Sequence, residues 1–152
     1  MKMKNKAFWW KDKQEDRVWD DSLEYYTYKE VKQKTPLDMV TEFQITFNQP
    51  VGVEYDYLSE LDNLRFRLVK EEYTEVKNAE EPEHLLKELA DLVYVVYGYA
   101  ATFGWGLDEA VRRVHISNMS KLDPTTGKPI YREDGKVLKG SNYKEPDLSD
   151  LV

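Results

Sequence analysis

Two pairs of carboxylates most constrain how this chain folds: they are Glu72 with Glu75 and Glu88 with Asp91. The members of each pair are three residues apart, so on a helix they lie on the same face. Both pairs lie at matching distances from residues 81–82, where Glu-Pro predicts a break between two helices. If that break is a tight hairpin, each residue of one pair faces a residue of the other: Glu72 opposite Asp91, and Glu75 opposite Glu88.

The four carboxylates occupy the apolar faces of their predicted helices. At about 100° per residue, Leu68 and Val76 lie within about 60° of Glu72, and Leu92 lies in the same arc around Glu88. Carboxylates that share a buried site repel one another and raise one another's pKa values, and a bound cation relieves that repulsion. An all-oxygen site without cysteine or matched histidines suits Mg²⁺ or Mn²⁺.

A di-iron carboxylate bundle is the alternative interpretation of this geometry. Such a site carries a histidine three residues after a glutamate on two of its helices. In this chain those positions are filled by Glu75 and Asp91. His84 lies one turn before Glu88 without a matching histidine on the preceding helix, so we interpret it as a surface residue near the turn.

Capping signals predict an all-α, four-helix bundle-like catalytic core over residues 35–122. Thr35 followed by Pro36 is typical of a helix start, and Ser59 begins a second capping-box pattern. The glycines after Phe103 are expected to end the third helix. The predicted helices run over about 36–48, 60–79, 82–103 and 108–120.

The regions on either side of the core differ from it in composition. Residues 1–34 are charged and aromatic without a helical or strand period, and we interpret them as an extension that docks on the core or on a neighbouring subunit. Residues 123–152 are rich in Pro, Gly, Lys and Asp. Within them, two short apolar segments flank Asp134-Gly135, which predicts a short β-hairpin that packs on the core.

Composition excludes several classes of function. The net charge of −7 argues against binding of nucleic acid or an anionic membrane through a basic surface. The absence of cysteine excludes disulfides and thiolate metal sites, and no apolar run is long enough to span a bilayer, so a cytoplasmic protein is expected. The sequence has no Gly-rich phosphate-binding loop, so any phosphates must be bound by metal and side chains.

Four further residues are candidates for substrate chemistry. Asn118 lies on an apolar stripe of the fourth helix with Lys121 beside it, which suits contact with a phosphate or a base, although a lysine at a helix C-terminus is equally explained by the helix dipole. Arg67 could pair with an acidic residue or with a phosphate. Glu71 is rotated about 100° from Glu72, and it is either a base that positions water or a solvated charge.

These motifs resemble a known group of enzymes. Residues 67–76 and 88–91 look like the E-x-x-E … E-x-x-D signature of the all-α nucleoside triphosphate pyrophosphohydrolases, a superfamily that contains MazG, the phosphoribosyl-ATP pyrophosphohydrolases and the dimeric dUTPases. Residues 115–121 and 132–140 resemble the MazG-like, phosphoribosyl-ATP-pyrophosphohydrolase-like branch often found in phages and bacteria. The resemblance covers about residues 37–148 and leaves out residues 1–34. Relatives often carry a histidine in the first helix where this chain has Gln44.

The resemblance implies Mg²⁺-dependent cleavage between the α- and β-phosphates of a nucleoside triphosphate, which yields a nucleoside monophosphate and pyrophosphate. It also implies a homodimer or homotetramer in which neighbouring chains complete the site. Two alternatives remain open. One is cleavage of phosphoribosyl-ATP, and the other is a non-catalytic helical oligomerisation or regulatory module of the same fold.

The resemblance assigns roles to individual residues. The ligands of Mg²⁺, or of Mn²⁺ in its place, would be Glu72, Glu75, Glu88 and Asp91. The general base would be Glu72 or Glu71. Asn118 would orient the phosphate or the base, and the charge on the leaving pyrophosphate would be neutralised by Lys121, Arg67 and Lys139.

Overall fold

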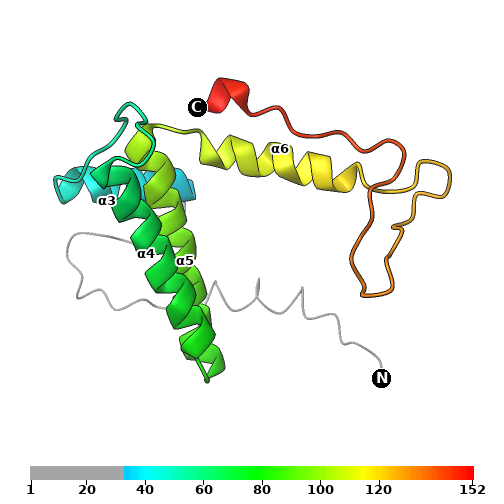
Figure 1. The fold of residues 1–152 in the computed structure, drawn as a ribbon, viewed down its shortest axis with the longest axis horizontal. Helices are drawn as coiled ribbons and strands as arrows, with labels where there is room; N and C mark the ends of the chain where they lie inside the picture. Colours follow the sequence, from blue (N-terminus) through cyan, green and yellow to red (C-terminus); the bar gives the residue numbers. More distant parts are fainter. Residues whose placement is uncertain (1–32) are drawn as a thin grey trace. The chain divides into compact units, whose positions relative to one another are not determined.

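A computed structural model describes residues 33–152 of the chain (Figure 1). This part contains four α-helices and one short 3-10 helix: α3 (Pro36–Thr46), α4 (Glu60–Asn78), α5 (Pro82–Phe103), α6 (Leu107–Met119) and η2 (Ser149–Leu151). The predicted all-α class is therefore confirmed for the described residues. Residues Thr35–Val152 form one compact unit. The docking predicted for residues 1–34 lies outside the described residues, apart from positions 33 and 34.

The helices begin and end at the signals that the sequence carries. Thr35 accepts a hydrogen bond from the Asp38 backbone at 3.2 Å, and the Asp38 side chain accepts one from the Thr35 backbone at 3.0 Å, which completes a capping box at the start of α3. Ser59 caps α4 in the same way, but the Asp62 side chain accepts from Leu58 N instead of Ser59 N. α5 ends at Gly104, whose φ of 73° is left-handed and suits glycine.

The helices α4 and α5 form an antiparallel pair that lies side by side, with α3 packed on α5 (Figure 1). The most buried apolar side chains come from α3 and the end of α5: Val40, Ala100, Ala101 and Phe103. Residues 52 and 53 of the connecting loop donate backbone hydrogen bonds to Ala101 and Thr102, which fixes the loop over the end of α5. The packing of α4 against α5 fixes the register of the two helices, and so determines which side chains face one another between them.

Residues 123–152 return along α6 and are held to it by side chains. The Arg113 guanidinium binds both carboxylate oxygens of Asp150, and Ser117 Oγ donates to Lys144 O at 2.7 Å. The backbone N–H of Gly106 donates to Leu151 O at 2.9 Å, next to the start of α6. α6 thus packs against η2 and α3, and not to a comparable extent against α4 or α5.

The β-hairpin predicted in this segment is not supported. Between residues 123 and 152 the structure has one isolated antiparallel bridge, Tyr131 with Val137, and no strand. The turn holds three residues between Arg132 and Lys136 instead of two, with Gly135 at φ 83°. Two backbone hydrogen bonds flank the bridge, Arg132 N to Lys136 O and Leu138 N to Ile130 O. A two-stranded ribbon alone is marginal in water, and no further strand within residues 123–152 extends this one. Within residues 33–152, no helix is long and apolar enough to cross a membrane.

Candidate metal centre

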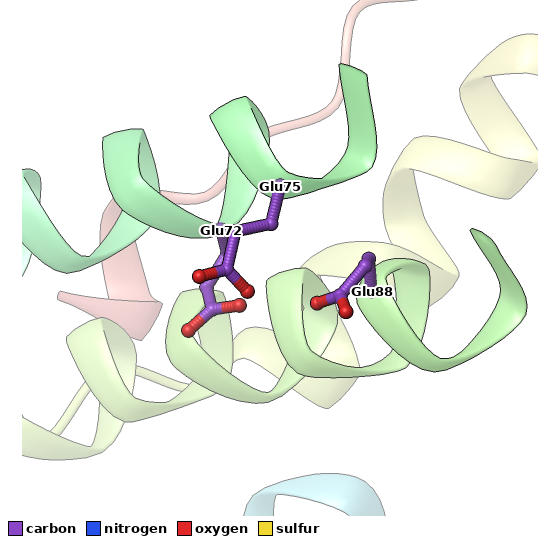
Figure 2. Close-up of side chains that lie close together, drawn as sticks. All are labelled: Glu72, Glu75 and Glu88. Atoms are coloured by element: carbon purple, nitrogen blue, oxygen red, sulfur yellow. The ribbon is translucent and has the colours of Figure 1, made fainter. Parts of the chain in front are cut away.

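Three of the four predicted carboxylates meet between α4 and α5. One carboxylate oxygen from each of Glu72, Glu75 and Glu88 lies within 4.8 Å of the others. Figure 2 shows Glu72 and Glu75 directed from α4 toward α5, and Glu88 directed from α5 into the same space. The arrangement follows from the three-residue spacing on α4 and from the antiparallel register set by the short break before Pro82.

The fourth carboxylate, Asp91, is turned toward a lysine. Lys87 Nζ lies 2.8 Å from Asp91 Oδ2 and 3.1 Å from each carboxylate oxygen of Glu88. His84 Nε2 also lies 2.8 Å from Glu88 Oε1. The Glu88 side chain is 2% exposed and the Asp91 side chain is 42% exposed. Lys87 therefore contacts one buried and one partly exposed carboxylate.

Sequence reasoning missed both basic neighbours of Glu88. It assigned His84 to the surface near the turn, and His84 is indeed exposed, but its ring contacts the buried carboxylate. The signal was present in the sequence, because Lys87 with Asp91 and His84 with Glu88 are four residues apart and therefore neighbours on a helix.

The carboxylates shift one another's proton affinities. Burial raises the pKa of Glu72, and the charges of Glu75, Asp91 and Glu88 raise it further. The pKa of Glu75 is raised mainly by its hydrogen bond with Glu88, with burial adding to the effect. Burial alone would raise the pKa of Glu88, but hydrogen bonds from Lys87 and Glu75 hold it below its ordinary value. The hydrogen bond between the two side chains thus favours protonation of Glu75 over protonation of Glu88.

The donor set fits a hard divalent cation. Oε2 of Glu72 is buried and has no hydrogen-bond partner, which is costly for a carboxylate oxygen unless a cation or a donor meets it. Two further carboxylates have oxygens within 4.8 Å, and Mg²⁺ and Mn²⁺ prefer oxygen ligands of this kind. Within the described residues, Glu72, Glu75 and Glu88 could hold such an ion.

The raised pKa values of Glu72 and Glu75 predict a pH dependence of stability. A carboxyl whose pKa is higher in the folded chain binds protons more tightly there, so the free energy of unfolding should fall as pH rises from about 4.3, the ordinary glutamate value, through the raised values. Urea unfolding in a chelator, at a series of pH values, should show this decline in the wild type. It should be weaker in Glu75→Gln, and equal slopes in the two proteins would contradict the assignment.

The remaining predicted residues fall into two groups. Arg67 and Glu71 are exposed on α4 and line one surface depression of about 390 Å³ together with Lys70, Thr74 and Glu75. They therefore lie beside one of the clustered carboxylates.

The second group lies on α6 and the segment after it. Lys121 Nζ donates to Asn118 Oδ1 at 2.6 Å near the end of α6. Lys139 Nζ lies 3.5 Å from Glu145 and 4.1 Å from the centre of the Tyr143 ring. α6 packs on α3 and η2 and extends away from the α4–α5 pair (Figure 1). A single chain therefore does not place Asn118, Lys121 and Lys139 at the acidic cluster, whereas Arg67 and Glu71 lie beside it on α4.

Comparison with known proteins agrees with the geometry. The family model for phosphoribosyl-ATP pyrophosphohydrolase matches residues 40–118, which span α3 to α6 and include all four carboxylates. No curated protein gives a significant match to the chain. The family model covers more than half of the 152 residues. The chain therefore belongs to the phosphoribosyl-ATP pyrophosphohydrolase family, whose activity is the hydrolysis of a phosphoric anhydride.

Proposed function

We propose that the protein is a Mg²⁺-dependent pyrophosphohydrolase that splits a nucleoside triphosphate between its α- and β-phosphates into a nucleoside monophosphate and pyrophosphate. The observation that carries this proposal is the convergence of Glu72, Glu75 and Glu88, with one buried Glu72 oxygen lacking a partner. Membership of a pyrophosphohydrolase family supports the class of bond that is cleaved.

Each acidic residue has a role in this proposal. Glu72, Glu75 and Glu88 hold the ion, and Asp91 becomes available to it if its contact with Lys87 opens. When bound, the ion supplies charge for the phosphate oxygens and lowers the pKa of a bound water. Glu71, at the edge of the depression and adjacent to Glu72, or Glu72 itself, accepts the proton of the attacking water.

Cationic side chains beside the acidic cluster receive the triphosphate. Arg67 and Lys70 line the same depression as Glu71 and Glu75, so they are placed to neutralise phosphate charge next to the ligands. Lys87 is a third cation at the cluster, 2.8 Å from Asp91. Asn118, Lys121 and Lys139 join the site only if α6 and the segment after it come from another copy of the chain.

Phosphoribosyl-ATP is the second candidate substrate, and the family match favours it directly. Its cleavage breaks the same kind of bond and also releases pyrophosphate, so the acidic cluster serves either substrate. A panel of ribo- and deoxynucleoside triphosphates with phosphoribosyl-ATP, assayed with Mg²⁺ for pyrophosphate and orthophosphate, separates the two. Turnover of phosphoribosyl-ATP alone would assign the second candidate, and orthophosphate as the sole product would overturn α–β cleavage. No turnover of any substrate would favour a non-catalytic module of this fold.

We also propose that the protein assembles as a homodimer or homotetramer. One stripe of α5 carries large apolar side chains at helical spacing that remain exposed: Leu86, Leu89, Val93 and Val96. Leu86 is 69% exposed and Val93 is 53% exposed, which is unfavourable for residues of this kind in water. A second copy that covers this stripe would bury it, and we propose that the α6 of one copy completes the site of another.

The assembly has its own test. We expect light scattering after size exclusion to give at least twice the mass of one chain for the wild type. Val93→Glu should shift the protein toward the monomer and reduce turnover, because a buried charge at a helix contact is unfavourable. Thr125→Glu adds the same charge at an exposed loop position and should change neither property. A monomeric wild type would overturn the assembly and leave the metal centre untouched.

A further inference from the structure

A small cavity with a mainly apolar lining lies between α3, α4 and α5, one to two helical turns from the acidic cluster. Its volume is about 110 Å³. The buried polar side chains that line it are Gln44 and Arg65, which are 1% and 6% exposed. Phe43 and Tyr94 line it at the surface, with 37% and 38% exposure. We call this cavity the amide pocket.

The hydrogen bonds of Gln44 fix which end of its amide is free. Nε2 donates to Pro50 O at 2.7 Å and to Thr102 Oγ1 at 3.1 Å. The Thr102 hydroxyl donates its own hydrogen to Gly98 O at 2.7 Å, so toward Gln44 it can only accept. A flipped amide would set an oxygen against two acceptors. Oε1 of Gln44 is therefore the atom left without a partner, and it is a buried acceptor.

Arg65 supplies the complementary group. Its Nη2 donates to Gln49 Oε1 at 3.2 Å, whereas its Nε is buried and has no partner. A guanidinium can only donate. Burial also lowers the pKa of Arg65, which reflects the cost of holding this charge in the interior. Gln44 and Arg65, which both line the amide pocket, thus carry one buried unmet acceptor and one buried unmet donor.

Gly98 keeps the space between these two groups open. A Cβ at this position would lie 3.3 Å from Gln44 Oε1 and 3.8 Å from Arg65 Nη1. Gly98 sits inside α5, where glycine is less favourable for helix stability than alanine. Its presence is accounted for by the close approach of the Gln44 oxygen.

The pocket is the right distance from the acidic cluster for the base of a bound nucleotide. Arg65 is seven residues before Glu72, and Gly98 is ten residues after Glu88, so they lie roughly 10 Å and roughly 15 Å along the helix axes from those carboxylates. A ribose and a base can span that separation while the phosphates stay at the cluster. Aromatic rings at the mouth, Phe43 and Tyr94, offer faces or edges on which a base can stack.

We propose that the amide pocket binds the base by its Watson–Crick edge and selects nucleotides in which that edge presents an amino group beside a ring nitrogen without hydrogen, as cytosine and adenine do. The amino group donates to Gln44 Oε1, and the ring nitrogen accepts from Arg65. Uracil, thymine and guanine present the reverse order, a carbonyl beside a ring N–H, and would set acceptor against acceptor and donor against donor. This inference rests on the proposed function.

The size of the cavity fits this use. A single water needs about 10–15 Å³, so the pocket is larger than one water requires. It is smaller than the roughly 300–1,000 Å³ of a pocket that encloses a whole ligand. It suits one edge of a ring, with the sugar outside. The pocket also disfavours phosphoribosyl-ATP, because in that molecule a ribosyl group occupies the ring nitrogen beside the amino group.

The test compares two pairs of substrates that differ in base edge: CTP with UTP, and ATP with GTP. We expect the wild type to favour the amino member of each pair by at least about tenfold in kcat/KM. Gly98→Ala places a methyl group against Gln44 Oε1, and it should bring both ratios toward one, mainly through KM. Gly106→Ala makes the same substitution beside Leu151, outside the pocket, and should keep both ratios.

A second variant and a binding measurement distinguish a failure of base selection by the amide pocket from a failure of the proposed hydrolysis. Phe43→Ala removes a ring at the mouth, and it should weaken all four substrates while keeping the ratios. Binding of the α,β-methylene analogues of CTP and UTP is measured by calorimetry and does not need hydrolysis. Equal binding and equal turnover within each pair would overturn the amide pocket alone. Selective binding of the amino bases without any hydrolysis would overturn the proposed function alone.

Discussion

Glu88→Gln should reduce kcat for pyrophosphate release by at least about 100-fold, the loss seen when a preorganised charge at a reaction centre is removed. The substitution keeps the size of the side chain and removes the one carboxylate of the cluster whose pKa is held low. Glu88 is 2% exposed and contacts Glu75, Lys87 and His84, so no other acidic group can take its place without rearranging the site. The measurement is steady-state release of pyrophosphate at saturating Mg²⁺.

The control for this prediction is Glu80→Gln. Glu80 lies in the break between α4 and α5 and is exposed, so the same change there should leave kcat within about twofold, as surface substitutions usually do. Glu75→Gln and Asp91→Asn should follow Glu88→Gln if all four predicted ligands act together. Retention of wild-type turnover by Glu88→Gln would show that the cluster is not the metal centre.

Mg²⁺ or Mn²⁺ should stabilise the folded protein, by about 2.7 kcal/mol at a free concentration 100 times the dissociation constant. The ion binds a set of carboxylates that the unfolded chain does not hold together, so binding favours the folded state. Thermal unfolding followed with each ion, and again after addition of a chelator, measures the effect and its reversal.

The same measurement on Glu75→Gln tests the electrostatic argument. The variant should melt at a higher temperature than the wild type in chelator at neutral pH, because it removes a carboxyl whose pKa the fold raises. It should then gain little from added metal. Na⁺ at matched ionic strength is the control for screening. A metal-induced increase as large as that of the wild type would mean that the ion binds elsewhere.

The part of the fold that the sequence predicted well is local. The start of α3 at Thr35, the break before Pro82 and the end of α5 at Gly104 depend on capping groups within a few residues of one another. The approach of Glu75 to Glu88 follows from the same short break, because a tight hairpin fixes the register of its two helices. The acidic cluster could therefore be anticipated from spacing alone.

What the sequence did not predict depends on contacts between distant residues. The turn around Gly135 was expected to organise a pair of strands, but the segment forms a single bridge there. Farther along, Lys144 is bonded to Ser117 of α6 and to Ser120 just after it, contacts that the local sequence does not reveal. The same holds for Arg65 and Gln44. Neither residue type is usually buried, and their burial depends on α3, α4 and α5 meeting at Gly98.

The contact between α6 and the segment that returns along it has a consequence for how the chain folds. The α4–α5 hairpin brings together residues that are close in sequence, so its contacts can form quickly. Arg113 and Asp150 are 37 residues apart, and Gly106 meets Leu151 across a longer stretch still. Closing those loops has an entropic cost before any contact rewards it. We therefore expect the acidic cluster to assemble early, and α6 to be secured late, as a slower second step.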